Sequence, residues 1–315
     1  NKFKRRFIFK FFLIFSTFCI IIGFIGHLTN GFKNMFTNPK NANLILVQST
    51  AMEDLDGCHG SKPEDNCRIG NKSKTTPSWA LIGDSHAGSL SSELSRELSK
   101  NNSSGIQLTQ GGCGYVLGLN KSFTDPTFCE NLNKKIEKII LNNEIKNIVI
   151  SARYVRYLFK TGYDNGEGGK ESDFEDTYYY PDNYNGNNER MNIILEAYKN
   201  SIENLLKADK NVFLVYPVPE IGWDVVRQTY KPFNKNNITI SYQSYLKRSK
   251  SVIDKFDELL LYNNFFKIDP SKLFCNITSP DRCETSINNK LIYFDDDHLS
   301  NDGAKLIINE ILNNN

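Results

Sequence analysis

The sequence predicts an α/β fold in which helices cover both faces of a parallel sheet, with one membrane-spanning helix before this domain. Two observations lead to this prediction. From Trp79 onward, short apolar runs bounded by turn residues alternate with amphipathic segments, and alternation at this spacing is typical of a parallel sheet. Near the N-terminus, a long apolar run directly follows a cluster of basic residues.

The apolar run extends from Phe7 to Leu28 and is interrupted only by Lys10 and His27. It is long enough to cross a hydrocarbon core of roughly 30 Å. A cleaved signal peptide is the alternative, but no small-residue cleavage site follows the run. Basic residues flank only its N-terminal side, which places that end in the cytoplasm. We therefore expect a transmembrane helix at residues 1–30, with the rest extracytoplasmic or periplasmic.

Composition and charge exclude some classes of protein. Apolar residues make up 39% of the 315 residues, which is ample for a core and argues against wholesale disorder. The formal net charge is only +2, and without the five basic residues at positions 1–10 it is −3. A nucleic-acid partner is therefore not expected, because such proteins normally carry a strong basic excess. The chain starts with Asn1 rather than Met, so a fragment of a longer protein is one possibility.

Residues 31–76 show little periodicity and are expected to form an extracytoplasmic extension or linker. Outside the apolar run, the chain has six cysteines that fall into three sequence-local pairs, namely Cys58 and Cys67, Cys113 and Cys129, and Cys275 and Cys283. Three local disulfides in an oxidising compartment are the simplest reading. The pairing stays open, because six cysteines allow 15 connectivities.

The remaining residues, 77–315, are expected to form one domain. Its strands are short apolar runs, predicted at residues 79–83, 106–109, 147–151, 212–219 and 265–270. Its helices carry apolar residues on one face, and they are predicted at residues 87–100, 132–141, 191–206, 245–262 and 300–312. Residues 160–190 contain eight acidic residues and five tyrosines. They are expected to form a surface insertion, with a sugar-binding loop as the alternative.

The first predicted strand ends in a motif that contains candidate catalytic side chains, Gly83-Asp84-Ser85-His86. A glycine turn between a parallel strand and a helix places Ser85 where open α/β sheets bind ligands. Helix N-terminal amides near its hydroxyl can stabilise a developing oxyanion. The alternative is an ordinary turn in which Asp84 or Ser85 caps the helix.

A serine nucleophile needs a base, and His298 in the sequence Asp295-Asp296-Asp297-His298 is the best candidate. An aspartate three residues ahead of a histidine can orient the imidazole while it accepts the serine proton. An acidic cap or a metal site is the alternative for this cluster. Each motif is weak alone, but the two together at opposite ends of one domain favour a serine enzyme.

These two motifs resemble those of the SGNH (GDSL-type) hydrolase family. The segments LIGDSHAGSL and YFDDDHLSNDGA are similar to the SGNH domain that is fused after the acyltransferase-3 (AT3) membrane domain in bacterial surface O-acyltransferases. The resemblance covers residues 77–315 and implies a flavodoxin-like three-layer αβα domain. It also implies that residues 1–30 are the last helix of an upstream AT3 domain.

The resemblance assigns roles to individual residues. Ser85 is implied to be the nucleophile, His298 the general base and acid, and Asp295 the orienting carboxylate, while spacing disfavours Asp296 and Asp297. The oxyanion-hole glycine of the family is matched by Gly112 in Gly111-Gly112-Cys113. The family's third block normally supplies an asparagine, but here Arg153 stands near that position. Arg153 is therefore expected to donate to the oxyanion or to bind substrate.

The function implied by the resemblance is O-acyl transfer, expected to be acetyl, to a cell-surface polysaccharide such as lipopolysaccharide O-antigen or peptidoglycan. The acyl group would come ultimately from acetyl-CoA through an AT3 domain in the same or another chain, so no cofactor or metal is expected in this chain. A membrane-anchored carbohydrate acetylesterase uses the same residues with water as acceptor. A non-catalytic glycan-binding module is a third hypothesis, against which the intact Ser85, Asp295 and His298 argue.

Overall fold

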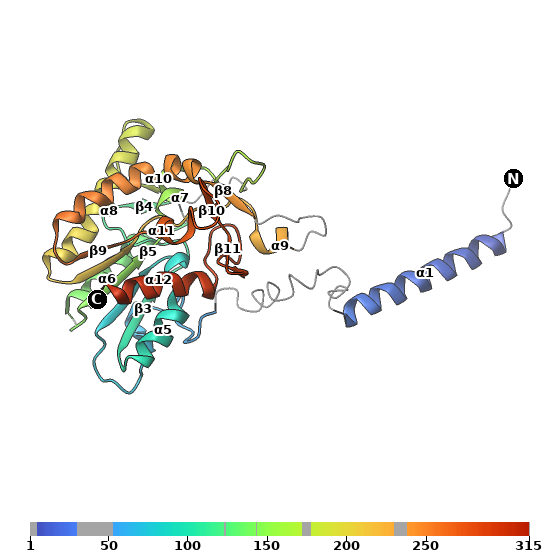
Figure 1. The fold of residues 1–315 in the computed structure, drawn as a ribbon, viewed down its shortest axis with the longest axis horizontal. Coiled ribbons are helices and arrows are strands. Elements are labelled where there is room, and N and C mark those ends of the chain that lie inside the picture. Colours follow the sequence, from blue (N-terminus) through green and yellow to red (C-terminus); the bar gives the residue numbers. More distant parts are fainter. Residues whose placement is uncertain are drawn as a thin grey trace.

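A six-stranded sheet forms the centre of the domain in the computed structural model of this chain (Figure 1). The structure describes residues 5–29, 53–122, 124–142, 144–171, 178–229 and 238–314. The strands, in their spatial order, are β1 (Arg68–Gly70), β3 (Ser104–Thr109), β2 (Trp79–Gly83), β5 (Asn147–Ser151), β7 (Asn211–Val215) and β9 (Phe265–Ile268). Strands β3 to β9 are parallel, and only β1 runs antiparallel at the edge. The predicted α/β class and flavodoxin-like order are confirmed.

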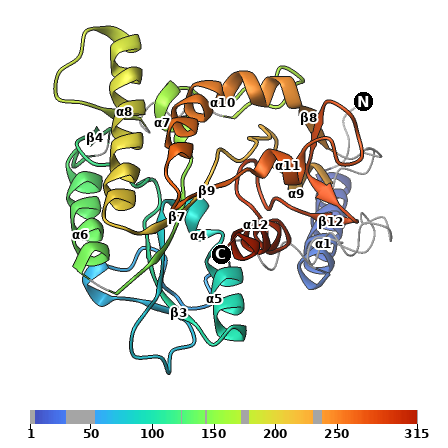
Figure 2. The same cartoon turned by 60° about the vertical axis from the view of Figure 1, so that its left-hand side comes forward.

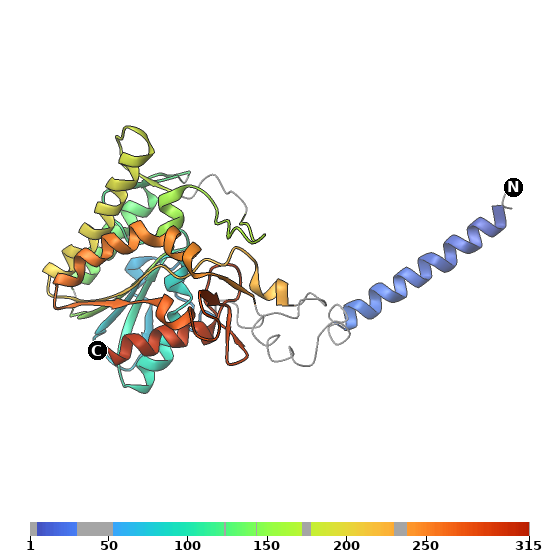
Figure 3. The same ribbon diagram turned by 45° about the horizontal axis from the view of Figure 1, so that its top comes forward.

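Helices cover both faces of this sheet, as Figures 2 and 3 show. One layer contains α6 (Phe128–Asn142), α8 (Gly186–Lys207) and the C-terminal part of α10 (Tyr242–Asp257). The opposite layer contains α5 (Ser91–Lys100) and α12 (Asn301–Asn313), which pack against each other. The sequence produces two layers because neighbouring strand residues point to opposite faces. Ile82 and Ile150 face the first layer, whereas Leu81 and Val149 face the second.

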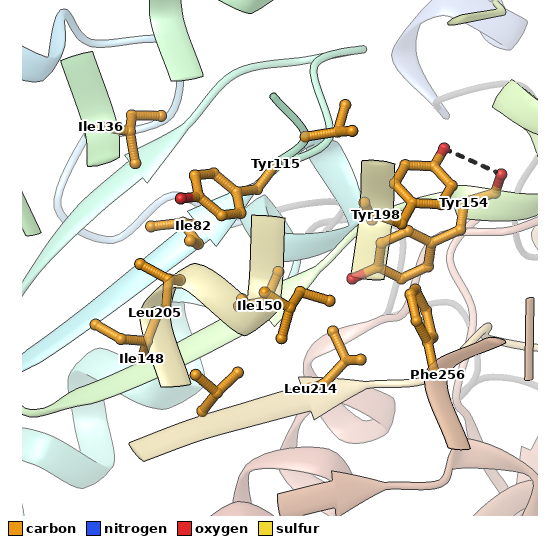
Figure 4. Close-up of a cluster of buried hydrophobic side chains, with 14 of the residues drawn as sticks. Ile82, Tyr115, Ile136, Ile148, Ile150, Tyr154, Tyr198, Leu205, Leu214 and Phe256 are labelled. Atoms are coloured by element: carbon orange, nitrogen blue, oxygen red, sulfur yellow. Dashed lines mark hydrogen bonds between the residues drawn. The ribbon is translucent and has the colours of Figure 1, made fainter. Parts of the chain in front are cut away.

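The first layer holds a core of aliphatic and aromatic side chains (Figure 4). Tyr154 meets Tyr198 and Phe256 edge to face there, and the Tyr198 and Phe256 rings are tilted to each other, with ring centroids 4.9 to 6.2 Å apart. The Tyr198 hydroxyl donates to the Tyr154 carbonyl at 3.4 Å. Aromatic pairs in such arrangements add to the free energy gained from apolar burial. This core holds α7 (Tyr154–Phe159), which follows β5, close to the carboxyl edge of the sheet.

Three disulfides link sequence neighbours, namely Cys58 with Cys67, Cys113 with Cys129, and Cys275 with Cys283. The other elements of the folded domain are short. They are η3 (Pro63–Asp65), α4 (Ser85–Gly88), β4 (Asn120–Lys121), β6 (Tyr179–Tyr180), α9 (Val225–Thr229), β8 (Thr239–Ser241), η4 (Glu258–Leu261), α11 (Pro270–Phe274), β10 (Arg282–Glu284), β11 (Ser286–Ile287) and β12 (Lys290–Leu291).

The second half of the predicted extension is part of the folded domain. Within residues 53–76, β1 pairs with β3, and Cys58 and Ile69 are fully buried in the second core layer. The three residues of β1 are too few to show a periodicity, so the sequence pattern did not reveal this strand. Residues 31–52 of the predicted extension lie outside the described residues.

The N-terminal apolar run forms α1 (Arg5–Leu28), a helix of 24 residues of which none is buried. Its length and hydropathy are sufficient to cross a membrane. Among the described residues, it is the one helix with these properties.

The topology directs three chain segments to one point at the carboxyl edge of the sheet. Gly83 at the end of the central strand β2 lies opposite both Thr109 of β3 and Ser151 of β5. From β2 the chain first forms β3 on one side and later β5 on the other. A reversal of this kind creates the crevice in which open α/β sheets bind ligands.

Candidate active site

The segment Gly83–His86, which we call the Ser85 turn, is fixed by its neighbours on both sides. Gly83 has φ +135°, and a Cβ atom there would lie 1.9 Å from the Ser151 carbonyl oxygen, so only glycine fits. The Asp84 carboxylate caps α4 by accepting from the His86 amide at 2.8 Å. Its other oxygen accepts from the Arg153 amide at 2.8 Å and from the Tyr157 hydroxyl. Ser85 consequently lies, partly exposed, just after the carboxyl end of β2.

His298 contacts the Ser85 hydroxyl directly. The distance from its Nε2 to Ser85 Oγ is 2.8 Å, and the Phe294 ring stacks on the imidazole at 5.4 Å between centroids. The loop that carries His298 is held by three backbone hydrogen bonds. The Ile221 amide donates to the Asp296 carbonyl at 2.8 Å, the Val225 amide to the Asp295 carbonyl at 3.2 Å, and the Phe294 amide to the His298 carbonyl at 3.1 Å. The structure thus brings together the serine and the histidine that the sequence singled out.

Two carboxylates, not one, face the other nitrogen of this imidazole. His298 Nδ1 lies 2.8 Å from Asp295 Oδ2 and 2.9 Å from Asp297 Oδ1. The second oxygen of Asp295 accepts from the His298 amide at 2.7 Å. The expectation that spacing disfavours Asp297 is therefore corrected, because residues 295–297 form bends rather than a helical turn. We call Asp295–His298 the carboxylate loop.

Asp297 is held in a buried ionic network. Its side chain is 4% exposed, and its Oδ2 lies 2.7 Å from Arg153 Nε and 3.0 Å from His86 Nε2. The Arg153 guanidinium also binds Glu171 and Glu220, each at 2.7 Å. Glu171 comes from the 160–190 insertion, so this segment contributes a carboxylate to the network. The guanidinium contacts given by the structure all run to carboxylates.

These charges set the ionisation of the site. Burial disfavours the imidazolium of His298, but Asp297 and Asp295 outweigh it and hold the His298 pKa well above its ordinary value. Burial likewise opposes the Asp297 anion, but His298 and Arg153 bring the Asp297 pKa well below its usual range. Burial and the neighbouring Asp297 and Asp295 raise the pKa of Asp296 to about 6.

Gly112 lies in a turn beside the Ser85 turn. The Gln110 amide donates to the Gly83 carbonyl at 3.0 Å, and the Cys113 amide closes the turn onto the Gln110 carbonyl at 2.9 Å. Gly112 has φ +74°, which glycine adopts without strain. Within the described residues, the amides of Ser85 and Gly112 donate to no backbone carbonyl. Both are therefore available as oxyanion donors.

Two sets of side chains in the site have the composition of a metal ligand set. One is His86, Asp297 and His298, and the other is Asp295, Asp296 and Asp297. However, Arg153 already supplies a cation to Asp297, and His298 Nε2 is engaged by Ser85. These contacts favour an ionic network over a metal centre, and the expectation of no metal stays a prediction.

Sequence reasoning did not assign several residues that the structure places here. Sequence alone gives no role to His86, which directly follows the serine, or to His59, which lies within the predicted extension. Glu171 and Glu220 converge on Arg153 from segments 49 positions apart, and no local pattern marks them. A signal existed only for Asp297, as one of three consecutive aspartates.

The chain was compared with protein families and with solved structures. A model of the SGNH domain (fused to AT3 domains) matches residues 54–313. The chain is similar in structure to the periplasmic domain of a lipopolysaccharide acetyltransferase from Salmonella ser. Paratyphi A, with 16% identity, 88% of this chain and 97% of that chain covered, and a TM-score of 0.52.

More distant similarities were also found. An acetyl xylan esterase shares 14% identity over 75% of this chain and 98% of its own, with a TM-score of 0.40. A GDSL-like lipase from Bacteroides thetaiotaomicron shares 11% identity over 75% and 85%, with a TM-score of 0.39. No curated protein matches significantly in sequence. The extent of the family match shows that this chain belongs to the SGNH domain family whose members are fused to AT3 domains.

Proposed function

We propose that this chain is a membrane-anchored O-acyltransferase that passes an acyl group, expected to be acetyl, to a hydroxyl of a surface polysaccharide through an acyl-Ser85 intermediate. The observation that carries the proposal is the continuous chain of contacts from Ser85 Oγ to His298 Nε2 at 2.8 Å and from His298 Nδ1 to Asp295 at 2.8 Å. A glycan-binding module has no need of this alignment, whereas a serine nucleophile requires it.

The proposed reaction runs in two halves. Ser85 Oγ attacks the carbonyl carbon of the donor while His298 Nε2 takes the hydroxyl proton, and the carbonyl electron pair moves onto the oxygen. The amides of Ser85 and Gly112 would stabilise this oxyanion. Collapse expels the donor's leaving group, which takes the proton from His298. In the second half, His298 deprotonates the acceptor hydroxyl, which attacks acyl-Ser85, and Ser85 regains its proton when the second tetrahedral intermediate collapses.

The rest of the proposal concerns supply and location. The helix α1 would anchor the chain with the basic N-terminal end in the cytoplasm and the domain outside. The acyl group would come, ultimately from acetyl-CoA, through an AT3 domain, because family members are fused to such domains. The Salmonella relative acts on lipopolysaccharide by its description, which makes a surface polysaccharide the first acceptor to test.

An acetylesterase is a second candidate, favoured by one observation. The His298 side chain is 20% exposed, so water can reach the base that would activate it. The same residues then release free acetate instead of an acetylated glycan.

One experiment separates these functions. The full chain in detergent is given 4-nitrophenyl acetate with deacetylated lipopolysaccharide or peptidoglycan, and acetyl on the glycan is measured against free acetate. Transfer predicts glycan acetylation that is lost in Ser85→Ala and retained in Ser73→Ala, an exposed serine. Release of acetate alone, still dependent on Ser85, supports the esterase. Turnover that survives Ser85→Ala contradicts both.

A further inference from the structure

A histidine outside the triad lies beside the Ser85 turn. His59 belongs to the loop closed by the Cys58–Cys67 disulfide, which we call the disulfide loop. Its imidazole rests against Gly88, the last residue of α4, where a Cβ atom would lie 2.7 Å from His59 Nδ1. The lack of a side chain at Gly88 thus makes room for the ring.

The other edge of this imidazole faces the turn that contains Gly111 and Gly112. A Cβ atom on Gly111 would lie 3.6 Å from His59 Nε2, and Gly111 directly precedes Gly112. His59, Ser85, Gly111 and Gly112 are all partly exposed. His59 Nε2 therefore lies beside the turn whose Gly112 amide is a candidate oxyanion donor.

The backbone of the disulfide loop is fixed at this point. The Asp54 carboxylate accepts from the Cys58 amide at 3.0 Å and from the His59 amide at 2.7 Å. The next residue, Gly60, donates its amide to the Thr109 carbonyl at the end of β3, at 2.9 Å. A group held in this way loses little conformational freedom when substrate binds.

The contacts of His59 Nδ1 fit a tautomer that leaves Nε2 as the donor. The Thr109 hydroxyl accepts from Gln107 Nε2 at 2.9 Å and lies 2.9 Å from His59 Nδ1. In this tautomer the hydroxyl donates its one hydrogen to Nδ1. The neutral ring then carries its hydrogen on Nε2, the nitrogen beside Gly111. Burial lowers the pKa of His59, against the opposing effect of Asp54 and Asp84, and this favours the neutral ring.

We infer that His59 is an additional catalytic residue, whose Nε2–H donates a hydrogen bond to the oxyanion formed at Ser85. It supplements the amides of Ser85 and Gly112 on the side of β3. This donor is chemically useful because the site lacks the family's asparagine, and the contacts of Arg153 run to carboxylates instead. No proton leaves Nε2 in this role. The inference rests on the proposed acyl-Ser85 chemistry.

Two conservative variants of the full chain test the role. His59→Asn places an amide near the position of Nδ1, so it can keep the Thr109 contact but has no donor at Nε2. His59→Gln does the reverse. His59→Ala removes both. Hydrolysis of 4-nitrophenyl acetate gives kcat and KM, and thermal unfolding reports folding.

The expected result is that kcat falls about a hundredfold in His59→Ala and His59→Asn, the scale of losing one oxyanion donor. KM should stay nearly constant, because the bond is made in the transition state, and His59→Gln should recover most of kcat. If Asn behaves as wild type while Gln behaves as Ala, the role is structural and the inference is overturned. Wild-type kcat in all three, or a change in KM alone, overturns it as well. An inactive wild-type chain contradicts the proposed function instead.

Discussion

The carboxylate loop and the disulfide loop each place a histidine near the Ser85 turn, but in different environments. His298 faces Asp295 and Asp297, and its pKa is raised well above the ordinary value. The His59 ring contacts the Thr109 hydroxyl, and burial lowers its pKa against the opposing effect of Asp54 and Asp84. With the roles proposed above, the difference would let one residue type supply two functions. Carboxylates at the ring stabilise the imidazolium that a general base must form, whereas burial beside a hydroxyl favours an uncharged hydrogen-bond donor.

The largest effect should come from removing the base. We predict that His298→Ala lowers kcat for 4-nitrophenyl acetate by about 10⁴-fold or more, as loss of a triad base does elsewhere. The matched variant His27→Ala, in the exposed helix α1, should leave kcat unchanged. A His298→Ala rate within about tenfold of wild type would exclude general-base catalysis by this residue.

The second-largest predicted effect is a loss of protein stability when the buried ionic network around Asp297 is broken. Arg153→Ala removes the arginine that contacts the buried Asp297 and the largely buried Glu171, and it leaves Glu220 with Arg248 as its remaining cation. Uncompensated buried charge costs about 3–5 kcal/mol of unfolding free energy. Thermal unfolding followed by circular dichroism should show a large drop in midpoint. Arg96→Ala is the control, because its pairs with Glu53 and Glu93 are one-third exposed on the arginine side and should contribute about 1 kcal/mol or less.

The pH dependence of activity is a third test of the comparison. Because His298 must be neutral to accept the Ser85 proton, kcat/KM should rise with pH through an apparent pKa above the ordinary histidine value. Asp297→Asn removes the largest attractive charge and should move this limb to lower pH. If the rise of kcat/KM stays at the same pH in Asp297→Asn but moves to lower pH in Asp295→Asn, the raised pKa of His298 is due to Asp295 alone.

The raised pKa of His298 also makes the stability of the fold depend on pH. A histidine with a raised pKa in the folded state stabilises the fold fully below the pKa of the unfolded chain. That contribution disappears as the pH rises through the raised folded-state pKa of His298. Stability should therefore fall from neutral to alkaline pH in the wild type, and fall less in Asp297→Asn. An identical decline in both would contradict this coupling.

The smallest predicted effect concerns Thr109, which contacts the ring of His59. Thr109→Val keeps the shape of a buried side chain but removes the hydroxyl between Gln107 and His59. Loss of such bonds costs about 1 kcal/mol, and the loosened His59 should lower kcat by less than His59→Ala does. Unfolding midpoints and kcat check both expectations. A larger loss of kcat than in His59→Ala would point to another role for Thr109.

The sequence was informative where the chemistry is local. Gly83-Asp84-Ser85-His86 joins a buried strand to a helix, and that pattern identifies the turn without other parts of the chain. His298 was found because few histidines are present and one follows three aspartates. Asp297 was misjudged because the dihedral angles of a loop, not sequence spacing, decide which carboxylate faces the ring.

Long-range contacts account for what could not be predicted. His59 reaches the site only because β1 pairs with β3 and a disulfide closes the loop before it, and residues 53–76 have no periodicity that signals either. Arg153 was recognised by resemblance, yet its partners Glu171 and Glu220 come from distant segments. Such convergence is a property of the folded chain alone.

The most direct test of the central claim is to look for the acyl-enzyme. The full chain is mixed rapidly with 4-nitrophenyl acetate, quenched with acid, and analysed by peptide mass spectrometry, while nitrophenol release is followed in parallel. The account predicts acetyl on Ser85, formed as fast as the first nitrophenol is released and absent in His298→Ala. Turnover without acetyl on Ser85, or acetyl on another residue that accounts for the turnover, would contradict it.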